Sequence, residues 1–159
     1  MSSIAGTRPE PAPGVPATLV FAWGNPGRGD DALGPLFAEA VEAWRLRGVE
    51  CLTDFQLQVE HALDLRGRRR VLFVDASLDA PPPCRLTRLV PARDASFTSH
   101  AMSPAAVLQV YANVEHEAPP PAWLLAIRGE RWGLGEPPSK AALAHLAVAL
   151  AIAGRWLDA

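Results

Sequence analysis

Carboxylates in the segments that follow apolar runs are the residues of this sequence best suited to chemistry. Asp30 and Asp31 close the glycine-rich segment GNPGRGDDALG, which follows the run TLVFAW, and Asp75 ends the run VLFVD. Carboxylates that lie where the chain leaves a strand can hold a cation or transfer a proton. An aspartate can also cap a turn or accept backbone N–H bonds, and for Asp75 both readings are open.

The glycine-rich segment does not suit phosphate. Gly24 and Gly29 have the spacing of the two P-loop glycines, but Asp30 and Asp31 replace the lysine and hydroxyl residue that should follow. The dinucleotide pattern GxGxxG is absent too, which argues against nucleotide binding. We expect Gly24, Gly27 and Gly29 to let the backbone turn sharply. Asp30 is expected to cap the following helix and Asp31 to face a cation, and the reverse assignment stays open.

His100 is the histidine that fits such a site. It lies in the polar stretch SFTSHAMSP, before Ser103, a predicted helix cap. Imidazole with carboxylates suits a borderline metal such as zinc or nickel. A lone loop histidine is also an ordinary surface residue, so the prediction rests on the combination. His61, beside Glu60, competes with it, but neighbours on a helix point in different directions and cannot readily chelate one ion.

The apolar periodicity predicts the elements that hold these residues. Strands are expected over 18–23, 49–55, 70–76, 84–90 and 122–129, and helices over 33–44, 59–65, 104–113 and from about 139. Strands that alternate with helices indicate an α/β fold, a three-layer, doubly wound, mostly parallel twisted sheet with helices on both faces. Loops at the carboxyl ends of its strands would gather at one edge, where ligands bind.

Length and composition predict one folded domain. The chain has 159 residues, of which 49% are hydrophobic. Residues 1–16 form a Pro-rich segment that we expect to be a disordered tail, and residues 17–159 are expected to be the single domain. A net charge of -2 gives no general attraction to nucleic acid or anionic membranes.

The sequence also gives expectations about the cellular location and the oligomeric state of the protein. Cys51 and Cys84 lie far apart and form no CxxC pair, so neither a disulfide framework nor a zinc site is indicated. The N-terminus has no signal-peptide core, and no uninterrupted apolar run appears long enough to cross a bilayer. We therefore expect a soluble cytoplasmic monomer that binds neither nucleic acid nor membrane.

Three motifs together resemble a known family. GNPGRGDDALGP, VLFVDA and SHAMSP are similar, in order and spacing, to motifs of the maturation endopeptidases of nickel-iron hydrogenases. The resemblance runs from Val20 to the last predicted helix. It implies a peptidase that removes a short C-terminal extension from a hydrogenase large-subunit precursor after nickel insertion. It also implies that Asp31, Asp75 and His100 hold the metal, which is nickel supplied by the substrate, with no tightly bound cofactor of the protein's own.

Two departures from the family pattern bear on mechanism. The family commonly has Asp-Glu-Gly where this chain has Asp30, Asp31 and Ala32. Many members also have Asp-Gly-Gly-Thr after the second strand, where this chain reads DFQLQVEHALDL from Asp54. That variant looks similar to the subgroup serving soluble, bidirectional NAD-linked hydrogenases. The catalytic nucleophile is not identified, and Asp31 and Asp54 are the candidates for activating water.

Two other functions fit parts of the pattern. A protein could bind the nickel-loaded precursor without cutting it, as a chaperone or checkpoint, because no serine, cysteine and histidine arrangement is apparent. A receiver-like phosphoacceptor domain also has an acidic pair and an aspartate after its third strand. It needs a lysine after the last strand, however, where this chain offers Arg128.

Overall fold

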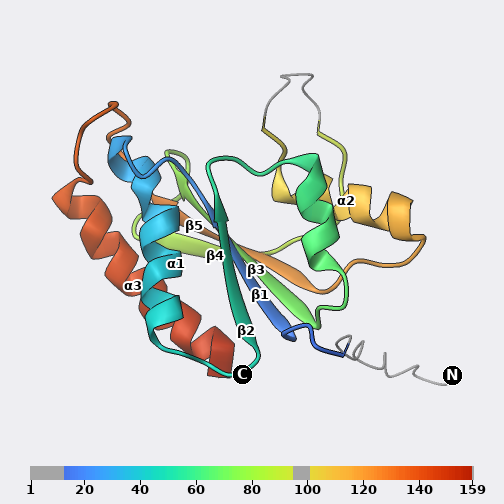
Figure 1. The fold of residues 1–159 in the computed structure, drawn as a ribbon. Helices are drawn as coiled ribbons and strands as arrows, with labels where there is room; N and C mark the ends of the chain where they lie inside the picture. The colour runs from blue at the N-terminus through green and yellow to red at the C-terminus, as the bar shows by residue number, and fades with distance from the viewer. Residues whose placement is uncertain (1–12, 95–100, 159) are drawn as a thin grey trace, which may run out of the picture.

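Five strands form one sheet in the order β2-β1-β3-β5-β4 in the computed structural model, which describes residues 13–94 and 101–158 (Figure 1). The strands are β1 (Thr18–Trp23), β2 (Val49–Asp54), β3 (Arg70–Ser77), β4 (Cys84–Arg88) and β5 (Ala122–Arg128). All neighbouring pairs are parallel except β4 with β5. The α/β prediction and all five predicted strands are confirmed, with ends that differ by one or two residues.

The position of each strand follows from its composition. β3 is central, and Val71, Leu72, Phe73 and Val74 are all fully buried, as a nearly continuous apolar run requires in a parallel strand covered on both faces. β4 is an antiparallel edge strand in which the partly buried Cys84 and Leu86 alternate with the exposed Arg85 and Thr87. The prolines of residues 81–83 separate it from β3 and keep the edge short.

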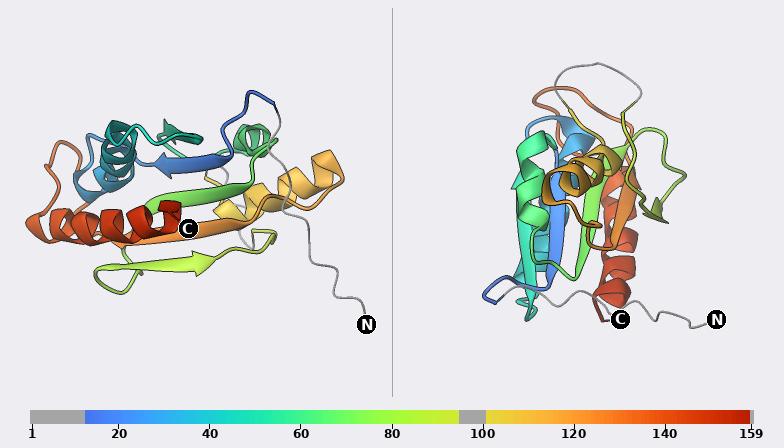
Figure 2. Two further views of the ribbon diagram at one scale, coloured as in Figure 1. Left: turned by 90° about the horizontal axis from the view of Figure 1, so that it is seen from below. Right: turned by 90° about the vertical axis from the view of Figure 1, so that its right-hand side faces the viewer.

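Helices cover both faces of the sheet (Figure 1, Figure 2). The elements are α1 (Leu33–Ala43), α2 (Pro104–Glu115), α3 (Lys140–Asp158) and two 3-10 helices, η1 (Gly29–Ala32) and η2 (Val59–Leu65). α1 and α3 lie on one face, and η2 and α2 lie on the other. Alternating residues of β1 supply both cores: Val20 faces α1 and α3, whereas Phe21 faces η2 and α2.

Local signals fix both ends of α2; its start is as predicted, and it runs to Glu115, two residues beyond the predicted end. The Ser103 hydroxyl accepts a hydrogen bond of 3.1 Å from the N–H of Ala106, and Pro104 occupies the first position. The helix ends at His116, which has a left-handed φ of 54°.

α3 is the one helix in the described part of the chain that is long and apolar enough to cross a membrane, by length and composition alone. This differs from the sequence expectation, which relied on the charged residues along it. Ala142, Ala149 and Ala153 of α3 are buried against α1 and the sheet. Its last carbonyls, of Trp156 and Leu157, accept hydrogen bonds from the Arg70 guanidinium. Core helices of soluble domains meet the same criterion.

The register of the sheet brings the carboxylates to one edge. Trp23 pairs with Asp54, and Ala22 pairs with Val74, so Asp75 follows beside Trp23. Phe73 and Trp23 pack in the core beneath η2 and α2, so the two-residue alternation puts Asp75 on that face as well. Asp54 follows the same alternation in β2. The two aspartates thus flank Trp23 at the carboxyl edge of the sheet, about 10 Å apart at two strand spacings.

Residues 13–16 form a turn within the segment that the sequence assigns to a tail. The carbonyl of Pro16 accepts a hydrogen bond of 3.0 Å from the buried Arg68 guanidinium, which also pairs with Glu50 at 2.6 Å. This contact fixes the approach of the chain to β1.

Candidate functional site

Asp30 anchors the loop that leaves β1. Its side chain is fully buried, and its oxygens accept hydrogen bonds from the N–H groups of Glu130 (2.8 Å), Arg131 (3.0 Å) and Ser139 (2.6 Å). The Ser139 hydroxyl donates a fourth, at 2.9 Å. The expectation that Asp30 caps the following helix is wrong, because neither η1 nor α1 has a side-chain cap. The carboxylate instead holds the loop before α3.

The electrostatics of Asp30 match this role. Burial would raise the pKa of the Asp30 carboxyl, but the backbone N–H groups and the Ser139 hydroxyl more than offset burial and hold its pKa below the ordinary value. Gly29 permits the contact: its φ is 51°, and an added Cβ would lie 2.5 Å from the carbonyl oxygen of Arg131. Asp30 is thus an ionised, fully satisfied structural group.

Asp31, the next residue, has a different environment. It is only partly buried, and its Oδ2 accepts a hydrogen bond of 2.7 Å from the N–H of Asn25. Gly24, with a φ of 150°, lies so close that an added Cβ would come within 2.0 Å of the Asp31 carbonyl oxygen. The prediction of special backbone angles is confirmed for Gly24 and Gly29 but wrong for Gly27, whose φ is not positive.

Asp75, near the end of β3, lies close enough to Asp31 for their charges to interact. Burial is the main cause that raises the pKa of the Asp75 carboxyl to about 7, and the negative charge of Asp31 raises it further. The N–H of Ala76 and the indole N–H of Trp23 donate to the carboxylate and oppose this shift. Two carboxylates therefore repel each other across a partly buried space, which a proton or a cation would relieve.

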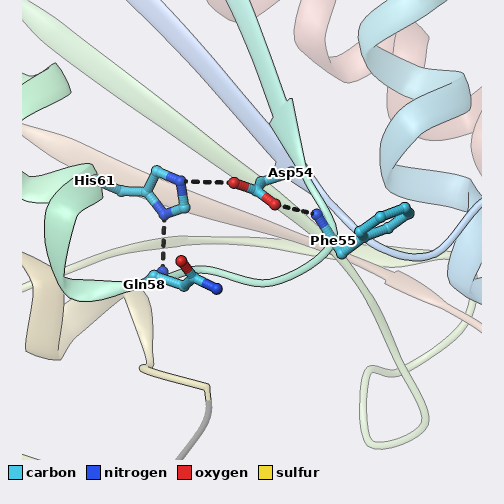
Figure 3. Close-up of polar contacts among 4 residues, drawn as sticks. All are labelled: Asp54, Phe55, Gln58 and His61. Atoms are coloured by element: carbon cyan, nitrogen blue, oxygen red, sulfur yellow. Dashed lines mark hydrogen bonds and ion pairs between the residues drawn. The ribbon is translucent and has the colours of Figure 1, made fainter.

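Asp54 and His61 form a second polar cluster on the same face (Figure 3). The Nε2 atom of His61 lies 3.1 Å from Oδ2 of Asp54, and the N–H of Phe55 donates to Oδ1 at 2.6 Å. On the other side of the ring, the N–H of Gln58 donates to Nδ1 of His61 at 2.8 Å. Asp54, a candidate for activating water, is thus paired with a histidine.

The contact of His61 with Asp54 was not predicted from the sequence. In the sequence, His61 was compared only with the adjacent Glu60, whereas its partner is Asp54, seven positions earlier, where the chain leaves β2. A signal was present: Gln58 and His61 have the spacing of a capping box at the start of η2. That spacing predicts a ring held over the first turn, but it does not predict which residue the ring contacts beyond the turn.

The predicted metal-binding residues are only partly described. Asp31 and Asp75 come together, and no group of three histidine, cysteine, aspartate or glutamate residues able to hold a metal occurs within residues 13–94 and 101–158. His100 lies outside the described residues. The described chain resumes at residue 101, and the N–H of Met102 donates at 3.0 Å to the carbonyl of Leu57, beside the second polar cluster.

The sheet differs from that of a receiver domain. A receiver has a parallel sheet in the order 2-1-3-4-5, whereas here β5 lies between β3 and an antiparallel β4. Arg128, the residue in place of the receiver lysine, donates to the carbonyls of Leu78 at 2.6 Å and Ala80 at 3.3 Å. The receiver-like alternative is therefore wrong.

Solved structures with this fold include several nickel-iron hydrogenase maturation proteases. HycI of Thermococcus kodakarensis superposes with a TM-score of 0.67 at 19% identity, over 92% of this chain and 96% of that chain. The maturating endopeptidase HybD of E. coli gives 0.68 at 22% identity, over 89% and 91%. A hydrogenase 3 maturation protease gives 0.64 at 19% identity, over 88% and 90%.

These matches show that the chain has the fold of the hydrogenase maturation proteases. No protein-family model matches the sequence, and no curated protein matches it significantly. At identities this low the likeness shows the fold alone, so activity has to be argued from the site.

The first prediction separates the two neighbouring aspartates by stability. Asp30→Asn replaces one carboxylate oxygen by an NH2 group, a donor that would face backbone N–H donors, and removes the charge, so we expect a loss of about 3 kcal/mol or more in the free energy of unfolding at pH 7. Because the folded pKa of Asp30 is lowered, this contribution is complete above its ordinary pKa and is lost as the pH falls below it. Urea denaturation measures the loss. Asp31→Asn is the matched control, and an equal loss in both variants contradicts the assignment.

The second prediction concerns pH and Asp75. Between about pH 4 and pH 7 the folded protein keeps a proton on Asp75 that the unfolded chain releases, so this group makes stability fall as the pH rises through that window. Asp75→Asn removes the buried charge and can still accept from Trp23. We expect the variant to gain about 2–4 kcal/mol over the wild type on going from pH 5 to pH 8 in the presence of a chelator.

Denaturation curves at both pH values test this expectation. Glu39→Gln, at an exposed site on α1, controls for a general effect of net charge. If Asp75→Asn shifts stability equally at pH 5 and pH 8, Asp75 does not titrate in that range.

Proposed function

We propose that this protein is an endopeptidase that removes the C-terminal extension of a nickel-iron hydrogenase large-subunit precursor after nickel insertion. The observation that carries the proposal is the facing pair Asp31 and Asp75, two carboxylates in mutual repulsion at the carboxyl edge of the sheet. A divalent cation brought by the substrate would relieve that repulsion, so a metal-loaded precursor would bind better than an empty one. The maturation-protease fold supports the same function.

The proposed metal ligands are Asp31, Asp75 and His100. Of the two neighbouring aspartates, we favour Asp31, because the oxygens of Asp30 are buried and already accept four hydrogen bonds. Two carboxylates and an imidazole leave coordination positions for groups of the precursor. The nickel is part of the substrate, and the peptidase would use it as a sign that the cofactor has been assembled.

Peptide hydrolysis also needs a base that removes a proton from the attacking water. With Asp31 on the substrate's nickel, we assign this role to Asp54, whose side chain is 41% exposed. Asp54 takes a proton from water as the water oxygen bonds to the carbonyl carbon of the scissile peptide. The carbon–nitrogen bond breaks, and the proton passes to the departing amine. The products are the mature large subunit and the released C-terminal peptide.

The substrate class can be narrowed by the segment after β2. It reads DFQLQVEHALDL in place of the glycine-rich segment of many maturation proteases. We propose the large subunit of a soluble, bidirectional NAD-linked hydrogenase as the substrate, with the reaction in the cytoplasm and the peptidase acting as a monomer.

The third prediction is that cleavage depends on the substrate's nickel. Purified protein is incubated with nickel-loaded or nickel-free precursor, and the mass of the large subunit is followed. We expect loss of the extension from the loaded form only. Tight binding of the loaded form without any mass change would instead identify a non-cleaving chaperone or checkpoint.

Variants test the metal ligands in the same assay. Asp31→Ala, Asp75→Ala and His100→Ala are expected to remain folded and to lose at least about 100-fold in processing rate, since a ligand to the substrate's metal is removed. His116→Ala is the matched control, because His116 lies at the far end of α2. Full activity in all three ligand variants would refute the assignment.

A further inference from the structure

His61 is fixed in one tautomer by its two neighbours. The N–H of Gln58 points at Nδ1 at 2.8 Å, and a backbone amide can only donate. Nδ1 is therefore the bare nitrogen, and the ring proton is on Nε2. Nε2 lies 3.1 Å from Oδ2 of Asp54, so it donates that proton to the carboxylate.

The ring has little freedom to move. Its side chain is 10% exposed, and Phe21 packs against it with the ring centroids 4.6 Å apart. Asp54 is held at two points, by His61 on Oδ2 and by the N–H of Phe55 on Oδ1, while much of its side chain faces solvent. Both oxygens of the carboxylate are thus held by hydrogen bonds (Figure 3), and the side chain is still 41% exposed.

Holding the turn of η2 does not by itself require a histidine. A capping box needs only an acceptor at its third helical position, which glutamate or glutamine commonly supplies. A glutamate at position 61 would accept from Gln58 equally well, but it would place a second carboxylate against Asp54. The N–H directed at Asp54 is therefore an additional feature, which histidine supplies and glutamine could imitate.

We propose that His61 is a positioning residue that orients Asp54 to take a proton from water. This rests on the proposed peptidase function. The Nε2–H group of His61 holds Oδ2, so that the remaining lone pairs of Asp54 point toward the open side, where water and the scissile peptide would lie. The proton from water goes to Asp54 and then to the departing amine. His61 keeps its own proton throughout, because both of its nitrogens are occupied.

A pair of nearly isosteric variants tests the proposal. His61→Gln keeps an acceptor for Gln58 and a donor for Asp54, whereas His61→Glu keeps only the acceptor. We expect kcat for the nickel-loaded precursor to stay within about threefold of the wild type in His61→Gln and to fall about 10- to 100-fold in His61→Glu, with KM unchanged in both. Loss of kcat to the same extent in His61→Gln, or wild-type kcat in His61→Glu, overturns the proposal.

Two further measurements keep the test decisive if His61→Glu folds poorly. His61→Phe preserves the contact with Phe21 but removes both the donor to Asp54 and the acceptor for Gln58, so kcat should fall at least as far as in His61→Glu. Nitrogen-15 NMR of the wild-type imidazole should show a bare Nδ1 and a protonated Nε2, and the opposite tautomer refutes the pairing.

The experiments distinguish failure of the proposed peptidase function from failure of the positioning role of His61. A wild-type protein that leaves the loaded precursor uncut overturns the peptidase and the catalytic use of Asp54, whereas the NMR experiment still reports the pairing of His61 with Asp54. A wild-type protein that cuts, together with an unchanged kcat in His61→Phe, overturns the positioning role alone.

Discussion

The buried carboxylate of Asp30 joins three parts of the chain that are distant in sequence. It lies in the loop after β1, and its donors come from the segment after β5 and from Ser139 at the start of α3. An ionised group at zero exposure is costly unless every lone pair is used, and here four hydrogen bonds meet that need. Because the side chain of Asp30 is directed into the protein, that of its neighbour Asp31 is free to face Asp75.

In the pair formed by Asp31 and Asp75, unlike at Asp30, hydrogen bonds do not fully compensate for the cost of burying the charge. Donors from Trp23 and Ala76 only partly compensate the burial of Asp75, so its charged form remains disfavoured. A structure optimised for stability alone would not place a second carboxylate there. Residual repulsion of this kind, next to a fully satisfied carboxylate one residue away, is typical of a site that awaits a cation or a proton.

The sequence predicts the elements well because their signals are local. The apolar run of β3 and the Ser103 cap of α2 each determine structure within a few residues. The sequence also places Asp31 and Asp75 at one sheet edge, because topology brings strand ends together. It does not predict the role of Asp30, whose partners lie about a hundred residues further along the chain. Nor does it predict the contact of His61 with Asp54, which depends on how the turn after β2 folds back.

Trp23 connects the two polar clusters. It pairs in register with Asp54 on one side and directs its indole N–H to Asp75 on the other, while its ring packs edge-on against Phe73 at 6.1 Å. Because β1 lies between β2 and β3, Trp23 separates Asp54 from Asp75 by two strand spacings. The carboxyl edge therefore carries two separate polar clusters, about two strands apart. A peptide held by its metal at the first cluster would have to extend across β1 to reach the second.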